Sequence, residues 1–311
     1  MGFKIIHSKI VLVGKISVVI NVVDEEIEVF PRVLDSVKDL ADEIVIIDST
    51  SKVVLPRVVM EYKTSVFKHE RVSYVEVARN FGIEKAQGDW ILILDPDEEL
   101  SLSLRKSLRK ICEDPEADYY RIPRKNIIFG KWMKHSRWWP DYNIRLFRKG
   151  CVSWSEIIHS VPETRGKGLD LEAIEENTII HYHYENLEQY IERMNRYTSE
   201  HAKNLLKEDY KFRWQDLITK PSNEFLSRYF QGKGYKDGIH GLALASLQAF
   251  SELVMYLKIW QEAKFVDLNP GIEKVIKIMK NSESDLHYWQ ADSLLNEVGG
   301  IKQRIRRKLK I

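Results

Sequence analysis

The sequence is poor in cysteine and has no long uncharged apolar run. Its two cysteines among 311 residues, Cys112 and Cys151, form no Cys-x-x-Cys pair, which argues against a disulfide framework and a cysteine-based zinc site. Two reduced thiols are instead typical of an intracellular protein. No segment reaches about 20 uncharged apolar residues, so no transmembrane helix is expected. Lys4, Lys9 and Lys15 interrupt the apolar N-terminus, and no signal peptide is expected there.

The sequence also has little net charge, only +2. That total hides two unlike parts, because residues 301–311 contain six basic residues and no acid, which leaves 42 basic against 46 acidic residues elsewhere. A slightly acidic body argues against nucleic acid as a partner, although the basic tail still suits another anionic surface. With 44% apolar and 30% charged residues, the chain is expected to be globular, and its length suggests roughly two domains.

The first half of the chain alternates short apolar runs with helical patterns. We expect strands at 16–21, 44–47, 58–62 and 90–94, and helices at 27–40, 74–86 and 101–111, the last with Ser101 as its N-cap. Strands that are apolar throughout and alternate with amphipathic helices predict an α/β fold with a mostly parallel sheet.

The pattern changes after residue 119. Aromatic residues cluster among basic ones up to residue 184, with less regular strands expected at 143–147, 151–154 and 178–184. Helical patterns then dominate, at 187–206, 241–260 and 272–279. We therefore expect an α/β domain over residues 1–184 and a helical region over 185–311.

Acidic residues follow two of the expected strands. Asp95 and Asp97 come directly after the strand at 90–94, and Asp48 ends the strand at 44–47. In parallel sheets, ligands bind at the carboxyl ends of the strands. An Asp-x-Asp pair there suits Mg²⁺ or Mn²⁺ held jointly with a diphosphate, and Asp48 suits a base or ribose. Ordinary Asp and Ser turns after strands account for the same residues.

Four segments together resemble family 2 glycosyltransferases of the GT-A fold: 16–26 (ISVVINVVDEE), 42–51 (DEIVIIDSTS), 78–100 (ARNFGIEKAQGDWILILDPDEEL) and 145–150 (RLFRKG). Residues 181–198 and 225–241 resemble more narrowly the branch with the β-1,4-glucosyltransferases of lipopolysaccharide-core assembly. The resemblance runs from about residue 16 to about residue 262. It implies a Rossmann-like GT-A catalytic domain over 1–184 and a nucleotide-sugar donor, with a UDP-sugar favoured.

The resemblance also implies roles for single residues in donor binding. Asp24 and Glu26 match positions near the nucleotide, and Asp48 matches the acid that contacts the base or ribose. Arg79 and Asn80 match an Ala-Arg-Asn element near the pyrophosphate or the donor sugar.

For the metal, the resemblance implies Asp95 and Asp97 as the binding pair, with Asp97 the more direct ligand, and His181 as the residue that completes the site. His183 shares a strand face with His181, because side chains alternate with period 2, so spacing does not exclude it. A core or surface histidine is the structural alternative for both.

The chain departs from the family in two places that bear on the catalytic base. The second acid after the strand at 44–47 is missing, and His159-Ser160 stands where the branch often has His-Glu. Our candidates for the base are Asp141 and Glu156, followed by Glu163. Aromatic neighbours are expected to raise the pKa of Asp141 by partial desolvation, although a Pro-Asp turn explains this residue equally well.

Two C-terminal segments suit a membrane surface. Residues 241–260 are long and apolar, and fit a core or oligomer helix as well as a bilayer interface. Ile301, Ile305 and Leu309 follow helical spacing among the six basic residues, which is typical of a basic amphipathic helix on an anionic membrane; a solvated tail is the alternative.

We therefore expect an inverting, metal-dependent glycosyltransferase that moves a sugar to a lipid-linked or glycan acceptor in the cytoplasm, with possible peripheral attachment to the inner membrane face. A nucleotidyltransferase is a rival, although residues 21–26 lack the glycine-rich phosphate loop that it normally needs. A degenerate membrane-bound scaffold is the non-enzymatic alternative.

Overall fold

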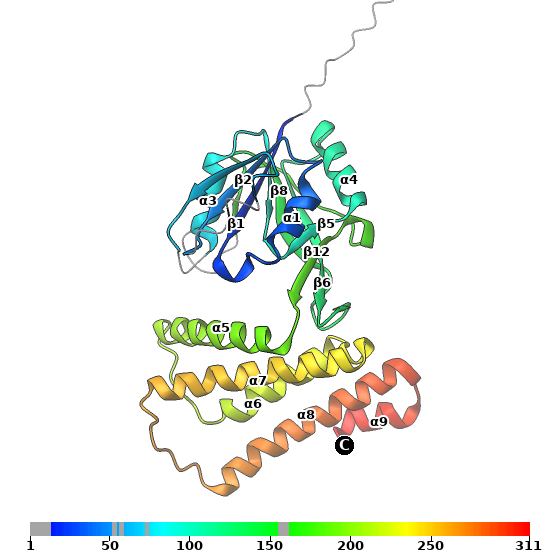
Figure 1. Cartoon of the computed structure of the whole chain (residues 1–311). Coiled ribbons are helices and arrows are strands. Elements are labelled where there is room, and N and C mark those ends of the chain that lie inside the picture. Colours follow the sequence, from blue (N-terminus) through cyan, green and yellow to red (C-terminus); the bar gives the residue numbers. More distant parts are fainter. Residues whose placement is uncertain (1–13, 52–54, 56–58, 72–74, 155–161) are drawn as a thin grey trace, which may run out of the picture. The chain divides into compact units, whose positions relative to one another are not determined.

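The computed structural model describes residues 14–51, 55, 59–71, 75–154 and 162–311. The chain divides into two compact units (Figure 1). Unit 1 comprises the chain up to Asn126 and Pro140–His183, and unit 2 comprises Ile127–Trp139 and Tyr184–Ile311. The sequence-based boundary after residue 184 differs from this division in two places, because Ile127–Trp139 and Tyr184 belong to unit 2.

Unit 1 is built on a mixed sheet with the strand order β3-β2-β1-β4-β8-β6-β12-β5. Its bounds are β1 Ile16–Val22, β2 Glu43–Asp48, β3 Thr64–Lys68, β4 Trp90–Leu94, β5 Glu98–Leu100, β6 Tyr119–Ile128, β8 Asp141–Arg148 and β12 Ile179–Tyr184. Strands β1 to β4 pair in parallel, whereas β8 runs antiparallel to both β4 and β6, and β12 antiparallel to β5. The predicted parallel sheet is thus confirmed for its first four strands.

Helices cover both faces of this sheet. Helices α1 (Phe30–Val37) and α4 (Leu102–Glu113) pack with Val18 and Ile20 of β1, while α3 (Val75–Lys85) packs with Val19 on the other face (Figure 1). Successive strand residues point to opposite faces, so a strand that is apolar throughout needs a cover on each side. Ser101 is the N-cap of α4, as predicted, and accepts a hydrogen bond from the Leu104 amide.

Smaller elements complete unit 1. They are the 3₁₀ turns η1 (Asp24–Glu26) and η2 (Glu175–Asn177), the hairpin of β9 (Val152–Ser153) and β10 (Glu163–Thr164), and β11 (Gly168–Asp170), which pairs with β6. Residue 58 lies outside the described residues, and the predicted strand at 58–62 is wrong over 59–62, where residue 59 is helical and residues 60–62 form a turn and a bend; the strand lies at 64–68.

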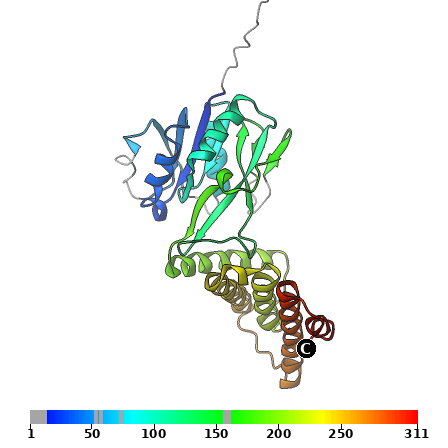
Figure 2. The ribbon, with the colours of Figure 1, turned by 90° about the vertical axis from the view of Figure 1, so that its right-hand side faces the viewer.

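Unit 2 is helical apart from the end of β6 and its partner β7 (Lys131–Trp132). Its helices are α5 Leu187–Lys207, α6 Asp216–Leu226, a π-helical turn η3 Ser227–Gln231, a 3₁₀ turn η4 Gly234–Asp237, α7 Ile239–Glu262, α8 Ile272–Val298 and α9 Ile301–Leu309. Helix α8 continues 19 residues beyond the predicted end at 279. Figure 2 shows α9 folded back beside α8 at the C-terminal end.

The centre of unit 2 is formed around α7. Leu244 of α7 packs with Tyr190 and Met194 of α5, and Met255 and Ile259 pack with Ala202 farther along α5. By length and composition, α7 is also the one helix in the described part of the chain that is long and apolar enough to cross a membrane. Since helices at the core of a helical bundle have the same composition, this is weak evidence for a span.

Candidate functional site

The carboxyl ends of β1, β2 and β4 lie side by side and bring three acids to one edge of the sheet. The register pairs Val22 with Asp48 and Ile20 with Leu94, so Asp48 ends β2 on one side of β1 and Asp95 follows β4 on the other side, while Asp24 lies in η1 after β1 itself. This is the edge at which parallel sheets bind ligands.

Two of these acids organise the turn after β2. The buried Asp48 accepts hydrogen bonds from the amide and hydroxyl of Thr50, at 3.0 and 2.7 Å, and forms an ion pair with Lys68 at 2.7 Å. Asp24 accepts hydrogen bonds from the amide and hydroxyl of Ser51. The Asx-type turn, which was the structural alternative for Asp48, is therefore present.

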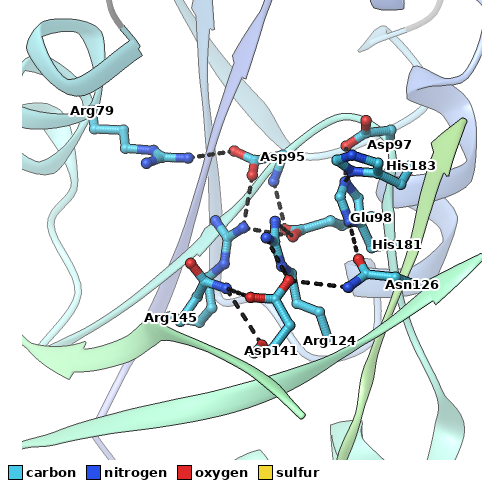
Figure 3. Close-up of polar contacts among 11 residues, drawn as sticks. Arg79, Asp95, Asp97, Glu98, Arg124, Asn126, Asp141, Arg145, His181 and His183 are labelled. Carbon is cyan, nitrogen blue, oxygen red and sulfur yellow. Dashed lines mark hydrogen bonds and ion pairs between the residues drawn. The ribbon is translucent and has the colours of Figure 1, made fainter. Parts of the chain in front are cut away.

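Asp95 lies between two arginines (Figure 3). Arg79 donates to its Oδ1 and Arg145 to its Oδ2, both at 2.7 Å. Arg145 also donates to the fully buried Glu98 at 2.5 Å, and Glu98 in turn accepts from the Asp95 amide at 2.9 Å. The strand β8 carries Arg145 into this position from beyond β4.

Burial and charge act in opposite directions on these carboxyl groups. Burial opposes the ionisation of Asp95, but the guanidinium groups of Arg145 and Arg79 outweigh it and hold the pKa of Asp95 well below its usual range. At Glu98, burial prevails over the attraction of Arg145 and raises the pKa, and the neighbouring negative charge of Asp95 adds to the effect.

Asp97 meets His181 although 84 residues separate them in sequence. The antiparallel pairing of β5 and β12 places His181 opposite Glu98, and the Tyr182 amide donates to the Asp97 carbonyl at 2.9 Å. As a result His181 Nε2 lies 3.6 Å from Asp97 Oδ1, and both side chains are almost completely buried (Figure 3).

Two further residues contact His181. Its Nδ1 lies 2.6 Å from Asn126 Oδ1, and its Nε2 lies 3.3 Å from His183 Nδ1. Asn126, on β6, also donates to Asp141 at 3.1 Å. Arg124 joins this group through Asp141 at 2.7 Å and Glu98 at 3.5 Å.

Comparison with known proteins identifies the catalytic unit. Residues 17–162 match the family model described as glycosyl transferase family 2. The chain carries a glycosyltransferase family 2 domain. Its mixed, mostly parallel sheet with helices on both faces agrees with the GT-A fold that the resemblance implied.

Relatives extend the match beyond the domain. An uncharacterized glycosyltransferase of Rickettsia typhi is 28% identical over 254 residues, which are 79% of this chain and 86% of the relative. The lipopolysaccharide core biosynthesis glycosyltransferase LpsC of Rhizobium meliloti is 25% identical over 70% of this chain and 83% of its own length. The crystal structure of Staphylococcus aureus TarS 1-349 aligns with a TM-score of 0.40 at 11% identity, over 94% of this chain and 88% of TarS.

Asp97 and His181 are the predicted metal ligands that the fold brings together, whereas Asp95 is engaged by arginines. Asp97 offers a carboxylate oxygen, and His181 Nε2 faces it, so a cation between them would be held by the two donor types that such ions accept. Each oxygen of Asp95 accepts from one arginine, so Asp95 would bind a cation only in addition to these hydrogen bonds, and its role as a ligand stays a prediction. No group of three or more metal-binding side chains occurs among the residues described, so a nucleotide diphosphate would have to supply further ligands.

The other predicted residues differ in where the fold places them. Glu26 is half-buried in η1, next to Asp24. Asn80 uses its amide to hold the backbone of Trp154, through bonds of 2.6 and 3.0 Å, which anchors β9 to α3. Glu163 is exposed on β10, and Glu156 lies outside the described residues.

The pKa of Asp141 differs from the expectation that it would be raised. Burial raises its pKa, as predicted from the aromatic neighbours, but the charge of Arg124 and the hydrogen bond from Asn126 outweigh burial and leave the pKa below its usual value. Asp141 is therefore ionised at neutral pH but is a weaker base than we expected.

The sequence analysis missed four residues of this site: Arg124, Asn126, Arg145 and Glu98. One signal was available, because Arg145 interrupts the apolar strand of the RLFRKG segment, and a buried charge in a strand needs a buried partner. For Asn126 no signal existed, since β6 was not recognised as a strand.

Proposed function

We propose that the protein transfers a sugar, with inversion, from a nucleotide-sugar to a lipid-linked or glycan acceptor, and that a divalent cation assists. The observation that carries the proposal is the meeting of Asp97 and His181 at the edge of the sheet where β1, β2 and β4 end. The family 2 domain supports the nucleotide-sugar donor, and a UDP-sugar is favoured. The name of the LpsC relative supports an acceptor of the lipopolysaccharide-core type.

In this proposal, each group at the sheet edge has a separate task. Asp97 and His181 hold Mg²⁺ or Mn²⁺, which supplies charge neutralisation for the departing nucleoside diphosphate. Asp24, Glu26 and Asp48 contact the nucleotide from the ends of β1 and β2. Arg79 and Arg145 fix the Asp95-to-Glu98 turn, so that Asp97 is presented in one orientation.

The acceptor hydroxyl must lose a proton as its oxygen bonds to the anomeric carbon and the bond to the diphosphate breaks. Asp141 and Glu156 remain our candidates for the carboxylate that takes this proton. The low pKa of Asp141 keeps it ionised and ready to accept, yet a carboxylate bound to Arg124 and Asn126 has a reduced proton affinity. Glu156 lies outside the described residues. It is supported only by its closeness in sequence to Trp154, which is anchored beside Arg79.

A thermal-shift panel tests the donor and the metal together. We expect UDP with Mn²⁺ to raise Tm more than either alone, because in this proposal the diphosphate and the cation bind the folded protein together. A ligand at a hundred times its Kd stabilises the folded state by about 2.7 kcal/mol. ADP, GDP and CDP with Mn²⁺ are the matched controls for the base. If no nucleoside diphosphate raises Tm, the sheet edge is not a nucleotide site, and the result favours the alternative of a degenerate, non-enzymatic scaffold. If only nucleoside triphosphates stabilise the protein and pyrophosphate is released, it is a nucleotidyltransferase.

We also propose that α9 attaches the protein peripherally to the inner face of the plasma membrane. Ile301, Ile305 and Leu309 are all more than half exposed along this helix. Of the six basic residues, Arg307 and Lys310 form ion pairs with Asp292 and Asp285 of α8, which orients α9 on its neighbour. The other four basic residues, Lys302, Arg304, Arg306 and Lys308, are those we assign to anionic lipid.

Changing these four residues to glutamine should abolish binding to anionic vesicles. Each basic residue near such a surface contributes about 1 kcal/mol, so the loss is roughly 4 kcal/mol, on the order of a thousandfold in partitioning. Co-sedimentation with phosphatidylserine vesicles measures it. The matched control removes the same charge from exposed positions in and just after α5: Arg196, Lys203, Lys207 and Lys211. Equal binding by the two variants would exclude α9 as the anchor.

A further inference from the structure

We propose that Asn126 is a positioning residue that holds His181 in the tautomer with a proton on Nδ1, and so directs the Nε2 lone pair toward Asp97. The inference rests on the proposed function in one respect, because the purpose of this lone pair is to bind the divalent cation. The orientation itself follows from the contacts of four buried or half-buried side chains in unit 1 (Figure 3).

The first step is the orientation of the Asn126 amide. Asp141 Oδ2 accepts from Arg124 Nε at 2.8 Å and NH2 at 2.7 Å, and Asp141 Oδ1 accepts from Asn143 at 3.2 Å. A carboxylate that is surrounded by these donors acts as an acceptor only. The side of Asn126 that faces Asp141 at 3.1 Å must therefore be its NH₂ group, because the reverse orientation would place two oxygens in contact.

The second step is the protonation of His181. With the NH₂ group turned to Asp141, the Asn126 oxygen faces His181 Nδ1 at 2.6 Å. An amide oxygen is only an acceptor, so Nδ1 must carry the hydrogen. Both side chains are buried, at 1% and 4% exposure, so water cannot replace this bond without cost.

The third step concerns the opposite side of the ring. In a neutral imidazole with Nδ1 protonated, Nε2 has a lone pair, and here it lies 3.6 Å from Asp97 Oδ1. A lone pair and a carboxylate oxygen repel each other unless a proton or a cation lies between them. Without a cation, His183 Nδ1, at 3.3 Å, can donate a hydrogen bond to the Nε2 lone pair. With a divalent cation between Nε2 and Asp97 Oδ1, the lone pair and the carboxylate oxygen would both bind the cation instead.

The arrangement resembles what proteins do at many metal sites, where a hydrogen bond to one nitrogen of a histidine fixes the ring and its tautomer so that the other nitrogen can bind. Here the sheet supplies the geometry. Asn126 on β6 and His181 on β12 lie on neighbouring strands, and Arg124 on β6 pairs with Asp141 of β8 across the same face.

The tautomer can be read directly in the metal-free protein. Long-range ¹H–¹⁵N spectra of protein labelled with ¹⁵N-histidine should show His181 with a protonated Nδ1 and a pyridine-like Nε2, assigned by loss of the signals in His181→Gln. In Asn126→Leu, which removes the acceptor but keeps the volume, the pyridine-like nitrogen should become Nδ1 or exchange between the two positions. Asn143→Leu is the matched control, because Asn143 also binds Asp141 but has no hydrogen bond to His181.

Manganese affinity gives a second readout. Titration with Mn²⁺ in the presence of UDP, followed by the EPR signal of the free ion, should show binding about 10- to 100-fold weaker in Asn126→Leu, the scale for residues that orient a ligand. Asn143→Leu should bind Mn²⁺ within about twofold of the parent protein.

The outcomes separate this inference from the proposed function. A parent protein with a protonated Nε2 overturns the inference, whether or not sugar transfer is found, and needs no variant that folds. An unchanged tautomer in Asn126→Leu overturns the positioning role alone. If the tautomer is as proposed and shifts in Asn126→Leu but Mn²⁺ does not bind the parent protein, the positioning role stands and the metal-dependent function fails.

Discussion

Replacing Asp97 by asparagine should reduce sugar transfer at least a hundredfold and remove its dependence on Mn²⁺. The amide keeps the size of the side chain but loses the negative charge, and a neutral oxygen is a much poorer partner for a hard cation. Loss of one group that stabilises charge in a buried site typically costs a factor of about 10² to 10³ in rate. The initial rate of transfer from a UDP-sugar, measured over a series of Mn²⁺ concentrations, gives both effects.

Glu99→Gln is the matched control for this experiment. Glu99 lies in the same acidic segment, and its carboxylate accepts a hydrogen bond from the Tyr182 hydroxyl at 2.9 Å, which a glutamine oxygen can also accept. The variant removes the same charge two residues from Asp97 and should leave the Mn²⁺ dependence unchanged. If Asp97→Asn keeps the Mn²⁺ dependence of the parent protein, then Asp97 is not the ligand.

The strands at the centre of the sheet were predictable because burial makes them apolar throughout. Three of the four strands expected in the first half lie where the pattern placed them, at β1, β2 and β4. The strand β3 was misplaced because it lies at the sheet edge, where alternate residues are exposed and charge is tolerated. Strand β6 was missed because Arg121, Arg124 and Lys125 interrupt it, and Arg124 has an ion-pair partner in Asp141 that is visible only in three dimensions.

The same reasoning explains which part of the site could be predicted. Acids at strand ends are visible in sequence, since the sheet edge where they gather is known from the fold class alone. The meeting of Asp97 with His181 followed from the family resemblance, and the pairing of β5 with β12 provides its physical basis. The pairing of Arg79 and Arg145 with Asp95 was not predictable, because it depends on the antiparallel register of β8 with β4 and β6, although Arg79 was named from the resemblance and the buried charge of Arg145 was a signal that it has a partner.

Replacing Arg145 by methionine should destabilise unit 1 by about 3 to 5 kcal/mol at neutral pH. The methionine fills a similar volume but leaves the fully buried Glu98 without its closest cation and removes one of the two arginines from Asp95. Breaking a buried ion pair by removing one partner is costly because an uncompensated charge remains. Urea denaturation, followed by far-UV circular dichroism, measures the free energy of unfolding.

The pH dependence of this loss has a definite sign. In the parent protein the pKa of Asp95 is depressed, so its contribution to stability is present above the pKa of the unfolded carboxyl and is lost as pH falls through the lower folded value. Without Arg145, the pKa of Asp95 rises toward its usual range and the pKa of Glu98, which burial already raises, rises further, so the folded variant binds a proton at Glu98 more readily than its unfolded chain does. Its stability therefore increases as pH falls from 7, and the difference from the parent protein shrinks toward pH of about 4.

Arg148→Met separates this effect from the loss of any arginine on β8. Arg148 lies on the same strand, but its nearest acid, Asp118, is 3.5 Å away and both side chains are more than a third exposed. Water screens such a pair, so the variant should lose less than about 1 kcal/mol and show no comparable change with pH. Equal losses for the two variants would mean that the Asp95–Arg145–Glu98 cluster contributes no more to unit 1 than a surface ion pair does. The cluster could then not fix the turn that presents Asp97 to the cation.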